Sequence, residues 1–68
     1  MPVAHLYRCS VVDQFGHVVV RYEVAADTDV EAIAQARIVY DHYPYGGYGL
    51  EVWEDARYVH CEYGRPLR

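Results

Sequence analysis

The sequence predicts a small α+β protein with the order β-β-α-β-β, in which one helix covers one face of a mainly antiparallel sheet. Three observations predict this fold. Alternating apolar and polar residues run through two segments that flank one stretch with helical spacing. Turn residues divide each flanking segment into a pair of strands. The length of 68 residues suits one domain with one core, so we expect residues 1–68 to form a single domain.

The first pair of strands is predicted at residues 3–12 and 17–24, which are rich in β-branched and aromatic residues. The turn "DQFG" lies between them, and Gly16 can adopt a positive φ there. A hairpin closed on this turn would place three pairs on the core side: Val11 with Val18, Cys9 with Val20, and Tyr7 with Tyr22.

The helix is predicted in "AADTDVEAIAQARIVYDHY". Thr28 followed by Glu31 matches a capping box, in which the threonine side chain accepts from the backbone of the first turn. Pro44 and the glycines after it end the helix and reverse the chain. Residues at helical spacing are expected to pack on the sheet: Ala32, Ile33, Ala36, Val39, Tyr40 and Tyr43.

The second pair of strands is predicted in "GLEVWEDARYVHCEY", with a turn near Asp55 and Ala56. A two-residue turn would pair Val52 with Val59 and Leu50 with Cys61 on the core side, and Trp53 with Tyr58 and Glu51 with His60 on the other side. Residues 64–68 are expected to form a frayed tail.

Three stretches resemble a group of small uncharacterised bacterial proteins with a hairpin–helix–hairpin plan. They run from Asp13 to His17, from Ala32 to Arg37 and from Glu51 to Val59, and match the patterns D-x-x-G-H, A-I/L-x-x-A-R and E-V/I-W-x-x-x-R-x-V. The resemblance covers most of the chain, and it implies the fold without implying an activity. The Tyr/Gly-rich segment after the helix is longer than expected in such proteins.

The composition disfavours several classes of partner. Ten acidic residues stand against six arginines and no lysine, giving a net charge of −4, so nucleic acid is a disfavoured partner. The apolar runs are too short to span a bilayer, and the first residues lack a signal-peptide pattern, so no membrane partner is expected. Two cysteines are too few for a disulfide framework, which favours a cytoplasmic protein with reduced thiols.

The sheet face opposite the helix is the first candidate site. A solvent-exposed sheet face normally carries polar side chains. This face instead combines aromatic, apolar and arginine side chains, which are typical of interfaces. We therefore expect a non-catalytic module that forms a homo-oligomer, with a dimer favoured, or binds another protein. The candidate partner-binding residues are Trp53, Tyr58, Leu6, Val19, Arg8 and Arg21, and the same face is expected to carry Ser10, Val12 and His60.

The loop "DHYPYGGYG" is the second candidate site. Tyr43, Tyr45 and Tyr48 could present amphipathic contact area to a small ligand, and the same loop, with His42, is an alternative place for a metal. The alternative is that these tyrosines cover the edge of the core where the helix ends. Both interpretations are compatible with the sequence.

Catalytic, metal and cofactor sites are not expected. Cys9 and Cys61 fall on predicted core positions, and His60 and Cys61 are adjacent, so they would point to opposite faces of a strand. No phosphate-binding glycine loop opens a helix. Binding of single-stranded nucleic acid on the aromatic face remains an alternative, because bases stack on such surfaces.

Overall fold

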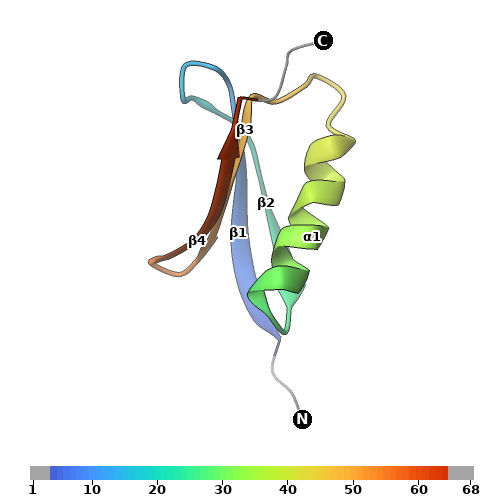
Figure 1. Cartoon of the computed structure of the whole chain (residues 1–68), viewed down its shortest axis with the longest axis vertical. Coiled ribbons are helices and arrows are strands. Elements are labelled where there is room, and N and C mark those ends of the chain that lie inside the picture. Colours follow the sequence, from blue (N-terminus) through green and yellow to red (C-terminus); the bar gives the residue numbers. More distant parts are fainter. Residues whose placement is uncertain (1–3, 65–68) are drawn as a thin grey trace.

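The computed structural model describes residues 4–64. It contains β1 (His5–Val12), β2 (Val18–Ala26), α1 (Asp29–Asp41), β3 (Gly49–Glu54) and β4 (Arg57–Tyr63), which confirms the predicted ββαββ order. All neighbouring strands are antiparallel, and the sheet order is β2-β1-β3-β4 (Figure 1). Within the described residues, no helix is long and apolar enough to cross a membrane. Apart from Gly64, the predicted tail lies outside this range.

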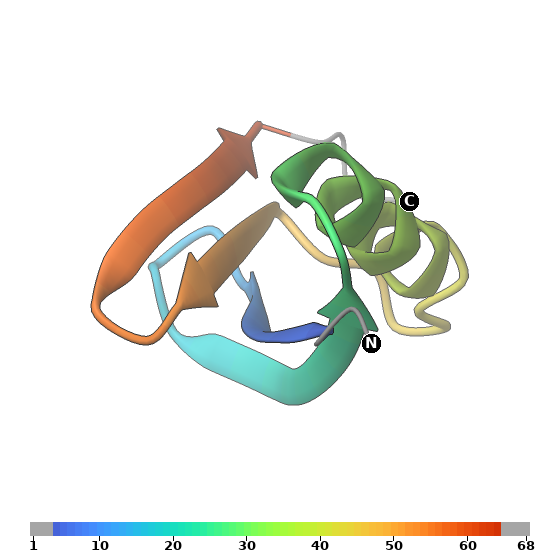
Figure 2. The ribbon, with the colours of Figure 1, turned by 90° about the horizontal axis from the view of Figure 1, so that it is seen from below.

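The helix α1 covers one face of the sheet and leaves the other face open. In two perpendicular views it lies on the side opposite the β3–β4 turn (Figures 1 and 2). Its buried residues are Ala32, Ala36 and Tyr40. The prediction that Val39 packs inward is wrong, because that side chain is 41% exposed. The core cluster consists of Tyr7, Cys9, Val11, Val24, Ala26, Ala32, Ala36, Tyr40, Leu50 and Val52.

Local interactions fix both ends of α1. The Thr28 hydroxyl accepts a hydrogen bond of 3.2 Å from the backbone N–H of Glu31, which confirms the cap that the sequence predicts. At the other end, the His42 N–H bonds to the carbonyls of Ile38 and Val39. Gly47 follows in a tight approach, where an added Cβ would lie 2.2 Å from Val11 Cγ1. The Tyr40 hydroxyl donates to the Gly47 carbonyl, 3.2 Å away, and so holds this junction on the core.

The β1–β2 register differs from the predicted one by two residues. Tyr7 faces Val24, Cys9 faces Tyr22, and Val11 faces Val20. The face assignment of these β1 residues is correct, because a shift of two keeps every side chain on its side of the sheet. A bulge follows, since Val12 faces Val18 and leaves Val19 without an opposite residue. The turn is therefore wider than the sequence suggests, and Asp13 closes it by accepting from the N–H groups of Phe15 and His17.

The β3–β4 hairpin turns at Asp55 and Ala56, and Trp53 faces Tyr58, as predicted. The other predicted pairs are wrong by one residue, because a bulge leaves Val59 without an opposite residue. Val52 faces His60, Glu51 faces Cys61, and Leu50 faces Glu62. Consequently Cys61 is exposed on the open face instead of buried, and His60 lies on the helix side instead of the open face.

Candidate functional site

The open face of the sheet carries three rows of cross-strand neighbours. Each row reads across β2, β1, β3 and β4, and its members point away from α1 because the alternate residues of β1 form the core. The rows are Glu23–Arg8–Trp53–Tyr58, Arg21–Ser10–Glu51–Cys61, and Val18–Val12–Gly49–Tyr63. We call these twelve residues the open face.

A groove of about 760 Å³ lies over the first two rows. The side-chain walls come from Arg8, Ser10, Val18, Arg21, Glu23, Glu51 and Trp53, with Cys9 and Tyr22 also lining it. The volume lies within the range of small-molecule and cofactor sites. Its lining holds two arginines and two glutamates, so the groove has no net formal charge.

The two arginines of the groove differ in their environment. Arg8 Nη2 donates a hydrogen bond of 2.6 Å to the backbone carbonyl of Asp55, which fixes the guanidinium beside the β3–β4 turn. Arg21 makes no hydrogen bond or ion pair with another described residue. Because a guanidinium carries five N–H donors, Arg21 can still bind a carboxylate or a carbonyl group in the groove.

An aromatic pair borders the groove on the β4 side. Trp53 and Tyr58 pack edge to face, with their ring centroids 4.7 Å apart. A hydrogen bond with Cys61 and burial raise the pKa of Tyr58 above its ordinary value. Tyr63 covers the backbone of Gly49 and donates to Glu51, and this bond raises the pKa of Tyr63. The aromatic side of the groove is therefore held in place by contacts among its own side chains.

The structure brings together most of the predicted partner-binding residues. Arg8, Arg21 and Trp53 line the groove, and Tyr58 packs on Trp53. Leu6 is 55% exposed and lies beyond the first row, opposite Ala25. The sequence predicts Val19 on the open face, but Val19 lies in the β2 bulge. Val18 lines the groove instead. Val12 is on this face but is buried, 3% exposed.

The Tyr/Gly loop does not line this groove. Tyr43 packs against the core cluster. The ring of Tyr45 lies edge to face with the ring of Tyr43, with the two centroids 5.7 Å apart. Tyr45 is 84% exposed, whereas Tyr48 is half-buried. The backbone N–H of Tyr48 donates to the Val12 carbonyl and so joins the loop to β1. One tyrosine of the loop covers the core, and one faces solvent.

The cysteines and histidines form no cluster. Among residues 4–64, no group of three or more His, Cys, Asp and Glu side chains could hold a metal ion. Cys9 is buried, and burial raises the pKa of its thiol to about 11, which makes it a poor nucleophile. Cys61 is exposed on the open face.

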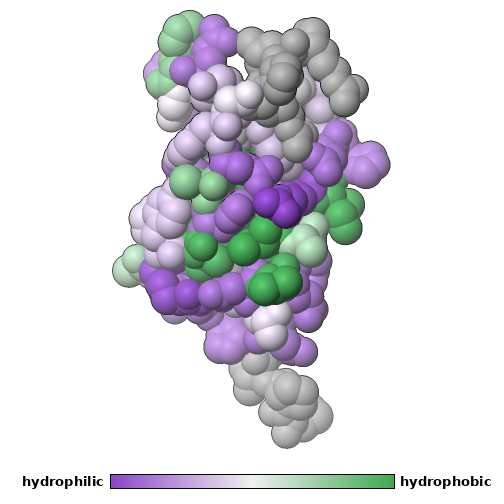
Figure 3. All heavy atoms as spheres, viewed as in Figure 1, coloured by the Kyte–Doolittle hydropathy of each residue, from purple (hydrophilic) through white to green (hydrophobic). Residues whose placement is uncertain are grey.

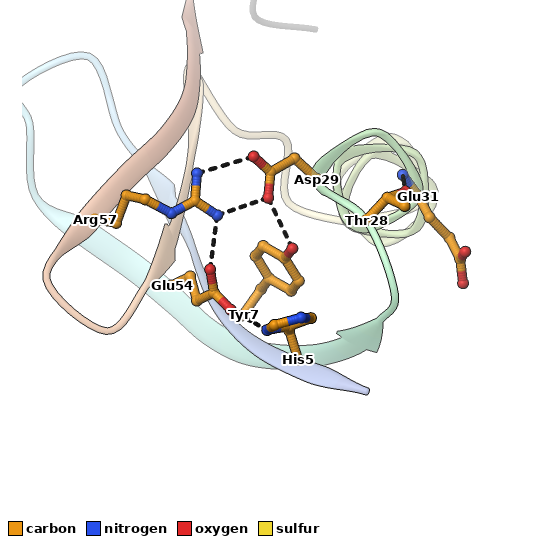
Figure 4. A network of polar contacts seen from close by, with 7 residues as sticks. All are labelled: His5, Tyr7, Thr28, Asp29, Glu31, Glu54 and Arg57. Atoms are coloured by element: carbon orange, nitrogen blue, oxygen red, sulfur yellow. Dashed lines mark hydrogen bonds and ion pairs between the residues drawn. The ribbon is translucent and has the colours of Figure 1, made fainter. Parts of the chain in front are cut away.

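A polar network that the sequence does not predict ties α1 to the sheet (Figure 4). Asp29 receives two hydrogen bonds from Arg57, of 2.9 and 2.7 Å, and a third of 2.7 Å from the Tyr7 hydroxyl. Arg57 also contacts Glu54 at 2.6 Å, and Glu54 contacts His5 at 2.6 Å. Asp29 and Arg57 are 28 residues apart, and neither residue belongs to a motif that would pair them.

The Asp29 carboxylate is held ionised by this arrangement. The hydrogen bonds from Arg57 and Tyr7 lower its pKa to about 2. The same Asp29 contact, together with burial, raises the pKa of Tyr7 to about 12. Every charged group of the network has a partner, so the network connects elements and offers no vacant position to a ligand.

No protein-family model, no curated protein and no solved structure matches this chain.

Proposed function

We propose that this chain is a non-catalytic protein-binding module that receives a segment of another protein in the groove of its open face. The observation that carries the proposal is the groove itself, about 760 Å³ in volume, on the sheet face opposite α1, which no helix or strand of residues 4–64 covers. Trp53 supplies apolar contact area, and Arg21 supplies unused hydrogen-bond donors. Tryptophan and arginine are the residue types that most often dominate binding energy at protein interfaces.

The charge pattern favours a protein over a nucleic acid. Two glutamates line the groove beside the two arginines, and they would repel a phosphate backbone. A polypeptide can satisfy both signs with its own side chains and with its backbone N–H and C=O groups. Two copies of this concave face packed against each other would leave the groove unfilled, which favours a convex segment of a different protein. The exposed thiol of Cys61 fits a reducing compartment such as the cytoplasm.

The proposal is tested by photo-crosslinking in cells. A photoreactive amino acid replaces Val18, which is 42% exposed and lines the groove, or Phe15, which is 75% exposed on the β1–β2 turn outside it. We expect a covalent adduct with a protein from position 18 and none of that mass from position 15. Equal adducts from both positions would contradict the proposal, and adducts with nucleic acid would replace it with the stacking alternative.

Two variants link the adduct to the groove. Trp53→Ala should weaken binding of the identified partner roughly 30-fold, since a central aromatic contributes about 2 kcal/mol or more. Phe15→Ala removes an aromatic side chain that is 75% exposed and lies outside the groove, and it should leave binding unchanged. Arg21→Ala serves if Trp53→Ala unfolds the chain, because Arg21 has no described structural partner. Unchanged affinity in a folded Arg21→Ala variant would exclude the groove.

A further inference from the structure

The two edges of the sheet differ in how they are covered. At the β2 edge, Gln35 of α1 donates a hydrogen bond of 3.1 Å to the carbonyl of Ala25, and the bulge at Val19 interrupts the strand. At the β4 edge, α1 is connected by the side-chain pairs Arg57–Asp29 and Arg37–Glu62. Bulges and covering elements protect sheet edges from pairing with another chain. The bulge of β4 lies at Val59, so the residues after it, from His60 to Tyr63, have less of this protection.

The backbone groups that face outward from β4 can be identified. The Gly64 N–H donates to the Tyr48 carbonyl at 3.0 Å, so the backbone N–H of residue 64 points toward β3. Hydrogen-bonded and non-hydrogen-bonded pairs alternate along an antiparallel ladder. Glu62 and His60 therefore point their backbone groups toward β3, and Cys61 and Tyr63 point theirs away from it. The strand "RYVHCEY" contains no lysine or proline that would discourage pairing at this edge.

We propose that a second copy of the chain pairs with this edge, β4 against β4 and antiparallel, to form a symmetric dimer with one continuous eight-stranded sheet. An antiparallel pair of identical strands is isologous, so the contact closes after two copies. Edge pairing of this kind gains main-chain hydrogen bonds from groups that water otherwise solvates.

The charges of β4 select the register of the pair. With Cys61 on the twofold axis, His60 faces Glu62 of the partner subunit, and Glu62 faces the partner's His60, all on the helix side. With Glu62 on the axis, two carboxylates would face each other, which destabilises a cross-strand pair. With Cys61 on the axis, its outward N–H and C=O groups would also bond directly to those of its copy.

Apolar surface beside β4 adds to the contact. Figure 3 shows hydrophobic surface in the middle of the molecule, in the region between β4 and α1 in Figure 1. Arg37 contacts Glu62 on β4, and Val30, two helical turns earlier, lies on the same flank of α1 and is 79% exposed. Val59 is only partly buried against the core. Both helices of the dimer lie on the same side of the joined sheet, so these flanks face each other across β4.

The chain has enough accessible surface to form a dimer interface of ordinary size. A stable interface buries about 800 Å² on each partner. That is about a sixth of the accessible surface of 4739 Å² of this chain. The contact lies outside the residues that line the open-face groove, so the groove stays accessible in the dimer.

The test compares two substitutions at Cys61 by native mass spectrometry and sedimentation, between about 1 μM and 1 mM, the range of weak complexes. Cys61→Ser keeps the backbone N–H, and we expect a dimer that dissociates on dilution, as for the unaltered chain. Cys61→Pro removes an N–H that β3 does not use, so the hairpin is kept and the dimer is lost. A Cys61→Pro variant that dimerises as tightly as Cys61→Ser overturns the proposal, and so does an unaltered chain that stays monomeric at 1 mM.

Two further measurements keep the proposal testable if Cys61→Pro does not fold. In the unaltered chain, hydrogen exchange at the amides of Cys61 and Tyr63 should slow as the protein concentration rises, and exchange rates that do not change would contradict the edge contact. A short bis-thiol reagent should join two copies through Cys61, since paired Cα atoms lie about 5.5 Å apart. The doubly altered chain Cys61→Ser, Ala56→Cys places an equally exposed thiol at the turn and should not be joined; joining at the same rate would exclude this register.

Discussion

Asp29 shows how one side chain can connect three parts of this fold. It is the first residue of α1, where a carboxylate interacts favourably with the positive end of the helix dipole. It also accepts hydrogen bonds from Arg57 on β4 and from Tyr7 on β1. The core contributes only ten side chains, three of them alanines, so polar ties between α1 and the sheet have a larger share in positioning the helix.

The depressed pKa of Asp29 predicts how stability depends on pH. Its pKa falls from an ordinary value of 3.8 to about 2 in the folded chain. Between these values the unfolded chain binds the proton and the folded chain does not, so stability is present above about pH 4 and is lost as the pH falls toward 2. Urea unfolding of Asp29→Asn should show a smaller loss of stability across this window than the unaltered chain. Asp27→Asn is the control, and an identical loss in Asp29→Asn would contradict the assignment.

The helix is the element that local sequence signals describe best. The Thr28 cap, the three buried residues at helical spacing and the stop before Pro44 all involve contacts within four residues along the chain. Sequence reasoning misjudged one flank, where Val39 is exposed, because it could not locate the strands on which the helix rests.

The capping hydrogen bond gives a prediction at this scale. Thr28→Ala should lower the free energy of unfolding by about 1 kcal/mol, because the N–H of Glu31 loses its acceptor. Thr28→Ser retains the hydroxyl and should stay close to the unaltered chain in the same urea titration. An equal loss of stability in the serine variant would show that the methyl group, and not the hydrogen bond, is responsible.

The strands illustrate what an alternating pattern can and cannot predict. Alternation assigned Tyr7, Cys9 and Val11 to the core correctly, because every shift by two residues preserves the face. It failed beyond each bulge, at Val18 and again at His60 and Cys61, because a bulge adds one residue and exchanges the two faces. Neither bulge is marked by a glycine in the strand, so the sequence contains no local signal for either.

The candidate site was predicted from the sequence only in part. Arg8, Arg21 and Trp53 were predicted together on one face, since all three lie on the regular side of a bulge. The groove between them could not be predicted, because it depends on which strands are neighbours. The same is true of the Asp29–Arg57 pair, whose partners meet only after the hairpins and the helix have assembled.

At the scale of the whole molecule, the order β2-β1-β3-β4 places the first strand in the middle. β1 has strands on both sides, and Tyr7, Cys9 and Val11 are buried beneath α1. We therefore compare the backbone amides of the four strands by hydrogen exchange at low protein concentration. Exchange should be slowest in β1 and fastest at the outward-pointing amides of β4. Exchange in β1 as fast as at Cys61 and Tyr63 would contradict this sheet order.

The bulge at Val59 also bears on how the gene of this protein can vary. Val59 has no opposite residue on β3, so an in-frame loss of its codon would leave Trp53 facing Tyr58, Val52 facing His60 and Glu51 facing Cys61. The deletion would cost some packing against the core and would leave the open face unaltered. Loss of the neighbouring codon for Tyr58 would remove the aromatic partner of Trp53 instead. Natural length variation in this hairpin should therefore gather at position 59.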